Sequence, residues 1–201
     1  MVATTLPIGV LALQGGFIEH GRMLERLGVS FREVRLPSDL TAVSALIIPG
    51  GESTTIGKLL VRTELDRAIR ARSAAGMAIW GTCAGLILLS RDIGPSGTRA
   101  GEPLPLLGLM DLRVRRNAFG AQLDSFETTL AAPAVAEHAI PAVFIRAPVI
   151  EHVGPAVEVL ARLPDERPVA AREGNLLVTA FHPELTDDPA FHRYFVEIVA
   201  A

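Results

Sequence analysis

The chain has 201 residues and a formal net charge of −3; 49% of its residues are hydrophobic and 20% are charged. This length suits one domain with a substantial core, and the weak net charge without long runs of like charge argues against a nucleic-acid-binding protein. The single cysteine, Cys83, excludes an internal disulfide bond and a multi-cysteine metal site, and it favours a reducing compartment.

The beginning of the chain resembles a signal peptide only faintly. Its apolar part is short, it lacks a basic leading segment, and its first charged residue is Glu19. We expect Ile8–Leu13 to form a buried strand instead. No apolar run approaches the roughly 18 residues that a membrane span requires. The sequence therefore predicts a cytoplasmic protein that does not bind a membrane.

Short apolar segments alternate with amphipathic segments in the first half of the chain. The expected elements, in chain order, are strand Ile8–Leu13, helix Phe17–Leu27, strand Phe31–Leu36, strand Ala45–Ile48, helix Thr54–Arg72, strand Met77–Trp80 and a helix over Ala84–Ser90. Fully apolar strands that alternate with helices are typical of a mostly parallel sheet with both faces covered. We therefore predict an α/β fold whose central sheet is flanked by helices.

The second half is richer in strands punctuated by proline and glycine. The expected elements are strands Leu109–Arg115, Ser125–Leu130, Ala142–Ile145, Val157–Leu163, Val169–Arg172 and Leu176–Phe181, followed by a helix over Asp188–Val199. Ile93–Pro105 resembles a linker, and we interpret it as a surface loop rather than a domain boundary. The prediction is a single domain over residues 1–201.

The cysteine lies in Gly81-Thr82-Cys83-Ala84-Gly85, a G-x-C-x-G pattern between a predicted strand and a predicted helix. In the serine version, such a junction holds the nucleophile on a strained turn. The amides that open the helix favour a thiolate, and the amide of Ala84 is placed to donate to an oxyanion. The alternative is a buried cysteine that acts as a small hydrophobic residue. The motif favours the nucleophile.

A cysteine nucleophile needs a base, and His182 is the best candidate because it follows an apolar strand and begins His182-Pro183-Glu184. Pro183 favours an extended backbone at His182, so Glu184 is expected on the same side of the chain, where it can orient the imidazole. The alternative is a strand-end histidine beside a solvated glutamate. The other histidines are less suitable: two are placed in helices, His20 and His192, and two in surface turns, His138 and His152.

A glycine-rich segment, Pro49–Thr55, follows the strand Ala45–Ile48. It is not a phosphate-binding loop, because Glu52 and Leu59 stand where that motif needs glycine and a hydroxyl residue. We expect a turn that leads into a helix capped by Ser53 or Thr54, with Gly51 as a second oxyanion donor. A plain helix-capping loop is the alternative.

These motifs together resemble the class I, triad-type glutamine amidotransferases, which have a flavodoxin-like fold. The resemblance is closest to the glutaminase subunits of pyridoxal 5′-phosphate synthase. It rests on IGVLALQG at Ile8–Gly15, PGGESTT at Pro49–Thr55, GTCAGLILL at Gly81–Leu89, RNAFGAQLDSFE at Arg116–Glu127, FIRAP at Phe144–Pro148 and FHPELTDD at Phe181–Asp188. Gly16, where relatives often have a larger residue, and a longer loop at Ile93–Pro105 depart from the pattern.

The resemblance implies hydrolysis of L-glutamine to glutamate and ammonia, and transfer of the ammonia to a synthase subunit that makes pyridoxal 5′-phosphate. No cofactor or metal is implied. The implied triad is Cys83, His182 and Glu184, and the implied oxyanion donors are the amides of Gly51 and Ala84. The implied substrate-binding residues are Gly50, Gly51, Glu52, Ser53, Arg116, Ile145 and Arg146; Gln14 is expected near the partner subunit.

Charge chemistry supports this assignment, because Arg116 suits the α-carboxylate of glutamine and Glu52 suits its ammonium group. Two rival interpretations remain at this point, namely another cysteine hydrolase, such as a peptidase-like relative, and a non-catalytic regulatory subunit.

Overall fold

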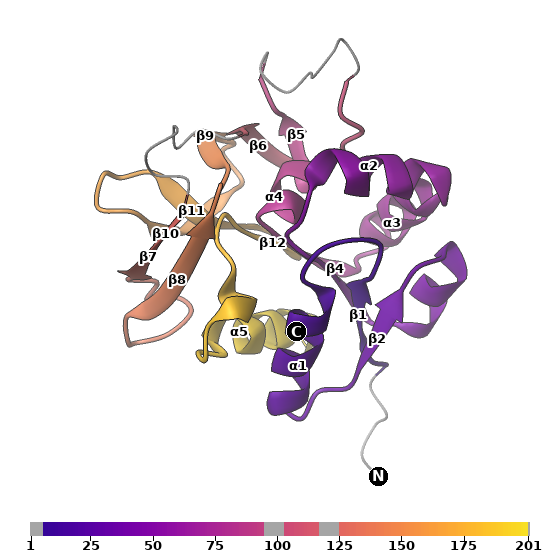
Figure 1. The fold of residues 1–201 in the computed structure, drawn as a ribbon, viewed down its shortest axis with the longest axis horizontal. Coiled ribbons are helices and arrows are strands. Elements are labelled where there is room, and N and C mark those ends of the chain that lie inside the picture. Colours follow the sequence, from indigo (N-terminus) through magenta and orange to yellow (C-terminus); the bar gives the residue numbers. More distant parts are fainter. Residues whose placement is uncertain (1–5, 95–102, 117–124, 201) are drawn as a thin grey trace.

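The computed structural model describes residues 6–94, 103–116 and 125–200, and its centre is a seven-stranded sheet (Figure 1). The strands of this sheet are β1 (Ile8–Leu11), β2 (Phe31–Val34), β3 (Ala45–Ile48), β4 (Ala78–Thr82), β10 (Glu158–Arg162), β11 (Pro168–Glu173) and β12 (Leu176–Thr179). Their order is β10-β11-β12-β4-β3-β1-β2. The strands from β12 to β2 are parallel, whereas β10 and β11 are antiparallel to their neighbours. The α/β prediction with a mostly parallel sheet is confirmed.

Helices cover both faces of this sheet. In Figure 1, α1 (Phe17–Arg26) and α5 (Ala190–Ala200) lie below it, and α2 (Ser53–Arg62), α3 (Leu65–Ala74) and α4 (Ala84–Leu89) lie above it. The 3₁₀ turns η1 (Pro37–Ala42) and η3 (Pro183–Leu185) connect other elements in the part of the chain that the structure describes. Every residue of β1, β3 and β4 is buried. These strands are apolar without alternation because both of their faces are covered.

Among the described residues, two smaller sheets lie beside the central one. The first has the order β5-β6-β9, with β5 (Ser90–Asp92), β6 (Met110–Arg115) and β9 (Val149–Val153); the second pairs β7 (Ser125–Leu130) with β8 (Ile140–Ile145). Phe126 of β7 stacks on Phe144 of β8 with ring centroids 4.6 Å apart. The ends of β6 and β8 carry Arg116 and Ile145, two of the predicted site residues, to the site described below.

Several predicted elements need correction. The helix predicted over Thr54–Arg72 is two helices, because Glu64 adopts a left-handed backbone with φ of 59° and separates α2 from α3. Strands β5 and β9 were not predicted, so His152 lies in a strand rather than in a turn. Residues 95–102, within the predicted loop Ile93–Pro105, and residues 117–124, within RNAFGAQLDSFE, lie outside the described residues.

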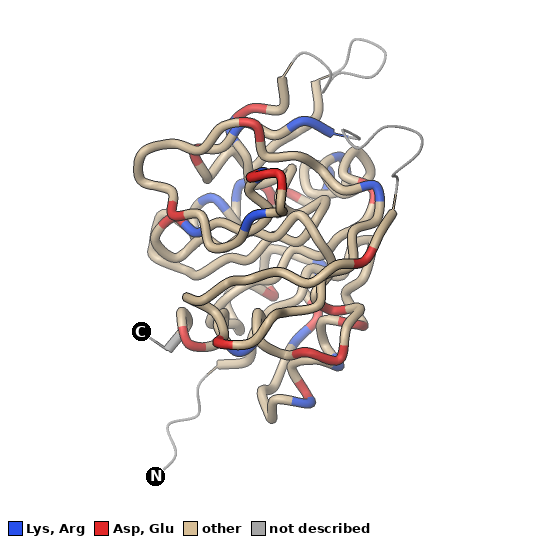
Figure 2. Tube along the Cα trace, turned by 90° about the vertical axis from the view of Figure 1, so that its left-hand side faces the viewer, with Lys and Arg blue, Asp and Glu red and all other residues tan. Residues whose placement is uncertain are grey.

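The described residues were compared with two expectations from the sequence, on membrane spans and on the distribution of charge. None of the helices there is long and apolar enough to cross a bilayer. In the side view of Figure 2, basic and acidic positions are mixed along the trace rather than gathered on one element.

Candidate active site

Cys83 lies at the sharp junction between β4 and α4, as the G-x-C-x-G pattern predicted. Its φ of 47° and ψ of −97° place a non-glycine residue in a strained conformation, and the residue is 7% exposed. A Cβ built on Gly81 would lie 2.5 Å from the carbonyl carbon of Gly85, and one built on Gly85 would lie 2.2 Å from the carbonyl oxygen of Ile48. The two glycines therefore allow the strand, the turn and the helix to pack closely enough to form this junction.

The register of the parallel strands brings the other predicted residues to Cys83. Ile48 of β3 is paired with Gly81 of β4, and Thr179 of β12 is paired with Thr82. The carboxyl ends of β3, β4 and β12 therefore meet at one edge of the sheet, where open α/β sheets bind their ligands.

His182 and Glu184 form a close pair behind Cys83. The Nδ1 atom of His182 is 2.7 Å from the Oε1 atom of Glu184, and the glutamate side chain is only 1% exposed. The backbone of His182, with φ of −108° and ψ of 85°, lies outside the helical region, as Pro183 favours, but it does not have the extended conformation that was predicted. The predicted contact is confirmed, but the expected extended chain is wrong: residues 183–185 form a 3₁₀ turn, and this turn carries Glu184 back to the imidazole.

The surroundings of His182 favour its protonated form. Burial lowers the pKa of His182, but its hydrogen bonds and charge interactions with Cys83 and Glu184 outweigh burial and raise the pKa to about 10. Burial raises the pKa of Glu184, but the histidines His20 and His182 outweigh burial and lower it. The carboxylate is therefore charged and holds an imidazole that readily takes a proton.

The glycine loop after β3 is attached to the turn between β1 and α1. The amide of Gly16 donates to the carbonyl of Gly50 over 3.1 Å, and the amide of Glu52 donates to Oε1 of Gln14 over 2.7 Å. A trans peptide places its N–H opposite its C=O, so the N–H of Gly51 points away from Gly16. A Cβ on Gly50 would lie 2.3 Å from Cε1 of His182, so this glycine lies directly against the imidazole.

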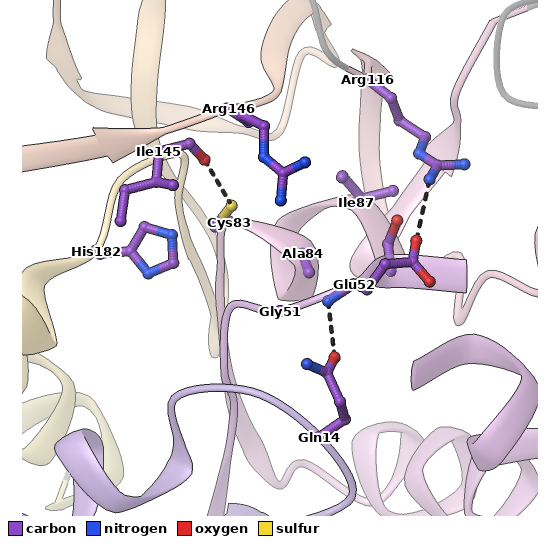
Figure 3. A pocket seen from close by; sticks show the side chains of 11 residues that line it. Gln14, Gly51, Glu52, Cys83, Ala84, Ile87, Arg116, Ile145, Arg146 and His182 are labelled. Carbon is purple, nitrogen blue, oxygen red and sulfur yellow. Dashed lines mark hydrogen bonds and ion pairs between the residues drawn. The ribbon is translucent and has the colours of Figure 1, made fainter. Parts of the chain in front are cut away.

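A pocket of about 420 Å³ opens over Cys83 (Figure 3). The described residues that line it are Gln14, Gly51, Glu52, Ser53, Cys83, Ala84, Ile87, Arg116, Ile145, Arg146 and His182. The sequence analysis had named all of these except Ile87. The sequence did contain an indication that Ile87 lines the pocket, because Ile87 lies four residues after Cys83, one helical turn along the same face of α4.

The pocket contains side chains of both charges. Nη2 of Arg116 lies 3.5 Å from Oε1 of Glu52 and 3.2 Å from Oγ1 of Thr54. Arg146 follows β8 with a positive φ of 44°, and its guanidinium extends over the pocket in Figure 3. The carbonyl oxygen of Ile145 lies 4.0 Å from the sulfur of Cys83. The arrangement suits a ligand with both a carboxylate and an ammonium group.

Glu52 also caps α2, which corrects the prediction that Ser53 or Thr54 would do so. Its carboxylate accepts hydrogen bonds from the amides of Thr54 and Thr55 and from the hydroxyl of Thr55. Partial burial raises the pKa of Glu52, but these hydrogen bonds outweigh it and lower the pKa to about 2. Glu52 is therefore an anion fixed at the pocket wall, and Ser53 is the first residue of the helix.

Two buried histidines beside Glu184 were set aside in the sequence analysis. His20 of α1 and His192 of α5 are completely buried, and Nδ1 of His20 lies 2.9 Å from Nε2 of His192. The burial of His20 could have been predicted, because His20 lies three residues after Phe17 and four before Leu24, on the apolar face of α1.

Comparison with known proteins places this site in a family. The model of the SNO glutamine amidotransferase family matches residues 10–201. The protein named pyridoxal 5'-phosphate synthase subunit PdxT from Herpetosiphon aurantiacus is 61% identical, over 95% of this chain and 99% of that protein. The protein of the same name from Roseiflexus castenholzii is 54% identical, over 96% of this chain and 100% of that protein.

Solved structures agree with this placement. A crystal structure described as a glutamine amidotransferase is 47% identical, covers 96% of this chain and 99% of its own, and has a TM-score of 0.88. PurLQS from Thermotoga maritima is 17% identical, covers 96% of this chain and 99% of its own, and with a TM-score of 0.66 shares the fold alone. The chain therefore belongs to the SNO glutamine amidotransferase family.

Proposed function

We propose that the chain hydrolyses L-glutamine to L-glutamate and ammonia through a thioester on Cys83, as one glutaminase domain over residues 1–201. The observation that carries the proposal is the strained Cys83 junction beside an imidazole that Glu184 holds at 2.7 Å. The pair of Arg116 and Glu52 in the same pocket favours glutamine over other amides, because it matches the two charges of an amino acid.

In the first half of the reaction His182 takes the proton of Cys83, and the sulfur attacks the side-chain carbonyl of glutamine. The amide of Ala84 opens α4 and has no helical acceptor, so it is free to bind the developing oxyanion together with the amide of Gly51. One donor of this kind contributes on the order of 3–4 kcal/mol to the stability of the transition state. His182 then returns its proton to the departing ammonia.

In the second half a water molecule attacks the thioester, with His182 as the base, and releases glutamate. Arg116 and Arg146 hold the α-carboxylate during both halves, and Glu52 holds the ammonium group. Gly50, Ser53 and Ile145 shape the walls around the amide. The mechanism needs no metal ion or bound cofactor.

The ammonia passes to a synthase subunit that makes pyridoxal 5′-phosphate in the cytoplasm. The names of the two PdxT relatives described above, which are 61% and 54% identical to this chain, support such a partner. Gln14 lies near the partner interface. Because Gln14 also bonds the amide of Glu52, binding of the partner at this turn changes the glycine loop. We expect weak glutaminase activity without the partner.

The test is a glutaminase assay of the purified chain with and without the synthase subunit, together with labelling by a glutamine-analogue electrophile. Wild-type protein should be labelled and the Cys83→Ser variant should not. A peptidase-like hydrolase would cleave peptides and ignore glutamine, and a regulatory subunit would take no label even with the partner present. Equal turnover with and without the partner would contradict activation through the glycine loop.

A further inference from the structure

A buried polar cluster lies behind Glu184, on the side away from His182. Nε2 of His20 is 3.4 Å from Oε2 of Glu184 and 3.2 Å from Oγ1 of Thr82, and Nδ1 of His20 is 2.9 Å from Nε2 of His192. These four residues come from η3, α1, β4 and α5. The cluster therefore joins the catalytic edge of the sheet to the two helices that cover its lower face (Figure 1).

The surroundings of the two histidines are apolar. The indole of Trp80 meets both imidazoles edge-on, with ring centroids 5.5 Å from His20 and 4.8 Å from His192. Burial lowers the pKa of both histidines and so favours their neutral forms. Polar groups in such a place destabilise the fold unless they are hydrogen-bonded, and apolar side chains would pack there without that cost. A buried imidazole that contacts the carboxylate of Glu184, with a second imidazole bonded behind it, therefore indicates a role beyond packing.

Each neutral imidazole has one donor and one acceptor nitrogen, so the cluster has two possible arrangements. If the shared proton lies on Nε2 of His192, His20 accepts at Nδ1. Its Nε2–H then lies between Oγ1 of Thr82, 3.2 Å away, and Oε2 of Glu184, 3.4 Å away. If the proton lies on His20, a lone pair of its Nε2 faces the carboxylate. His192 then also has a buried Nδ1–H for which the described residues offer no acceptor. Unpaired buried donors are rarer than unpaired acceptors, so the first arrangement is favoured.

We propose that His20 is a positioning residue for the reaction: it donates from Nε2 to Oε2 of Glu184, and His192 sets its tautomer. This inference rests on the proposed triad. Oε2 of Glu184 is buried and has no hydrogen-bond partner among the described residues, whereas Oε1 is already paired with His182. The 3.4 Å contact is not yet a hydrogen bond, and Nε2 of His20 lies closer to Oγ1 of Thr82, at 3.2 Å. The proposal therefore requires the contact with Oε2 to tighten when substrate is bound, as catalytic contacts often do.

The consequence is a carboxylate held at both oxygens. During turnover His182 gains and then loses a proton, and Glu184 must keep its orientation through both steps. The titratable and charged groups near this carboxylate are His182 and Asp187 on its own segment and Glu19, His20, Arg22 and Arg26 of α1. Cys83 and His192 lie one contact further away, against His182 and His20. Among these, His20 is the group placed to donate to the free oxygen.

The test compares His20→Leu, which removes the donor, with His20→Gln, which returns an amide N–H near the position of Nε2. In the complex with the synthase subunit, His20→Leu should lower kcat about tenfold to a hundredfold, the usual range for a hydrogen bond to a charged group, with little change in KM. The alkaline limb of the kcat/KM profile should move to lower pH, because a loosely held Glu184 stabilises the His182 cation less. His20→Gln should recover most of both properties.

The matched control is Ile69→Ala, a cavity in α3 on the opposite face of the sheet. It should lower the stability of the fold and leave the alkaline limb unchanged. The inference would be overturned if His20→Leu had the wild-type kcat and an unchanged alkaline limb of its kcat/KM profile. It would also be overturned if His20→Leu and His20→Gln lost kcat equally. If His20→Leu does not fold, nitrogen-15 NMR of the wild-type protein decides: the inference requires a proton on Nε2 of His20, and a proton on Nδ1 contradicts it.

A different result would overturn the proposed function. If Glu184→Gln keeps full activity, or if Cys83→Ser still hydrolyses glutamine, the proposed triad itself is wrong. If both variants are inactive and His20→Leu behaves as wild type, the triad stands and only the role of His20 is lost.

Discussion

Replacing Gly50 by alanine should lower the activity about a hundredfold without unfolding the protein. The backbone of Gly50 lies outside the left-handed region, so alanine can adopt its conformation. The added Cβ would lie 3.3 Å from the Cβ of Cys83, a tight contact, but only 2.3 Å from Cε1 of His182, which no side chain tolerates. The perturbation is therefore directed at the imidazole.

The size of the effect follows from this contact. Nonbonded carbon atoms meet at about 3.5 Å or more, so the 2.3 Å contact forces the imidazole and the loop apart by roughly 1 Å. A displacement of about 1 Å at reacting groups can cost about a hundredfold in rate, or about 2.7 kcal/mol in the activation free energy. The hydrogen bond from His182 to Glu184 would be strained by the same movement.

The assay is steady-state glutaminase activity of the complex with the synthase subunit, with thermal unfolding measured in parallel. Gly76→Ala is the matched control: Gly76 has φ of 92° and its added Cβ would meet no atom within 4 Å. That variant should lose stability through backbone strain and keep its kcat. If Gly50→Ala retains more than about a third of the wild-type kcat/KM, less than 1 kcal/mol is lost, and the close contact with His182 does not matter as argued.

Three further predictions follow from the site. Glu52→Ala should lower the unfolding free energy by about 1 kcal/mol, because α2 loses its cap, and should raise KM for glutamine; an unchanged KM would remove Glu52 from substrate binding. Arg116→Lys should raise KM, since lysine lacks the planar fork for a carboxylate; full retention of KM would refute that contact. The raised pKa of His182 stabilises the fold fully below pH 6.5, and urea titrations should show this contribution being lost as pH rises to about 10. A Cys83→Ala variant should lose much of this dependence.

Local sequence patterns were sufficient to predict most strands of the central sheet. The apolar runs at β1, β3 and β4 were recognisable because strands buried on both faces lack polar positions. The break between α2 and α3 was not predictable, because it depends on the left-handed backbone of Glu64, a residue with no special preference for that conformation. Strand β9 was missed because Glu151 and His152 are polar, and its pairing with β6 is a tertiary contact.

The sequence by itself determined which chemical groups the site contains. The motif Gly81-Thr82-Cys83-Ala84-Gly85 predicted a strained nucleophile, because glycine frees the local backbone regardless of distant residues. Pro183 predicted that His182 would lie outside the helical region, because proline restricts the backbone of the residue before it. The contact between His182 and Glu184 was also predicted, although the backbone that makes it, a 3₁₀ turn, was not.

Only the tertiary structure decided how these groups act together. Residues 50, 83 and 182 meet because parallel pairing sets the register of β3, β4 and β12, and pairing between distant strands leaves no local signal. Glu52 caps α2 because the helix begins at Ser53, which places the amides of Thr54 and Thr55 within reach of the Glu52 carboxylate. The contact of His20 with Glu184 depends on the packing of α1 and η3 on one face of the sheet. The sequence therefore showed a histidine on an apolar helix face, but it could not show that Glu184 is the partner of this histidine.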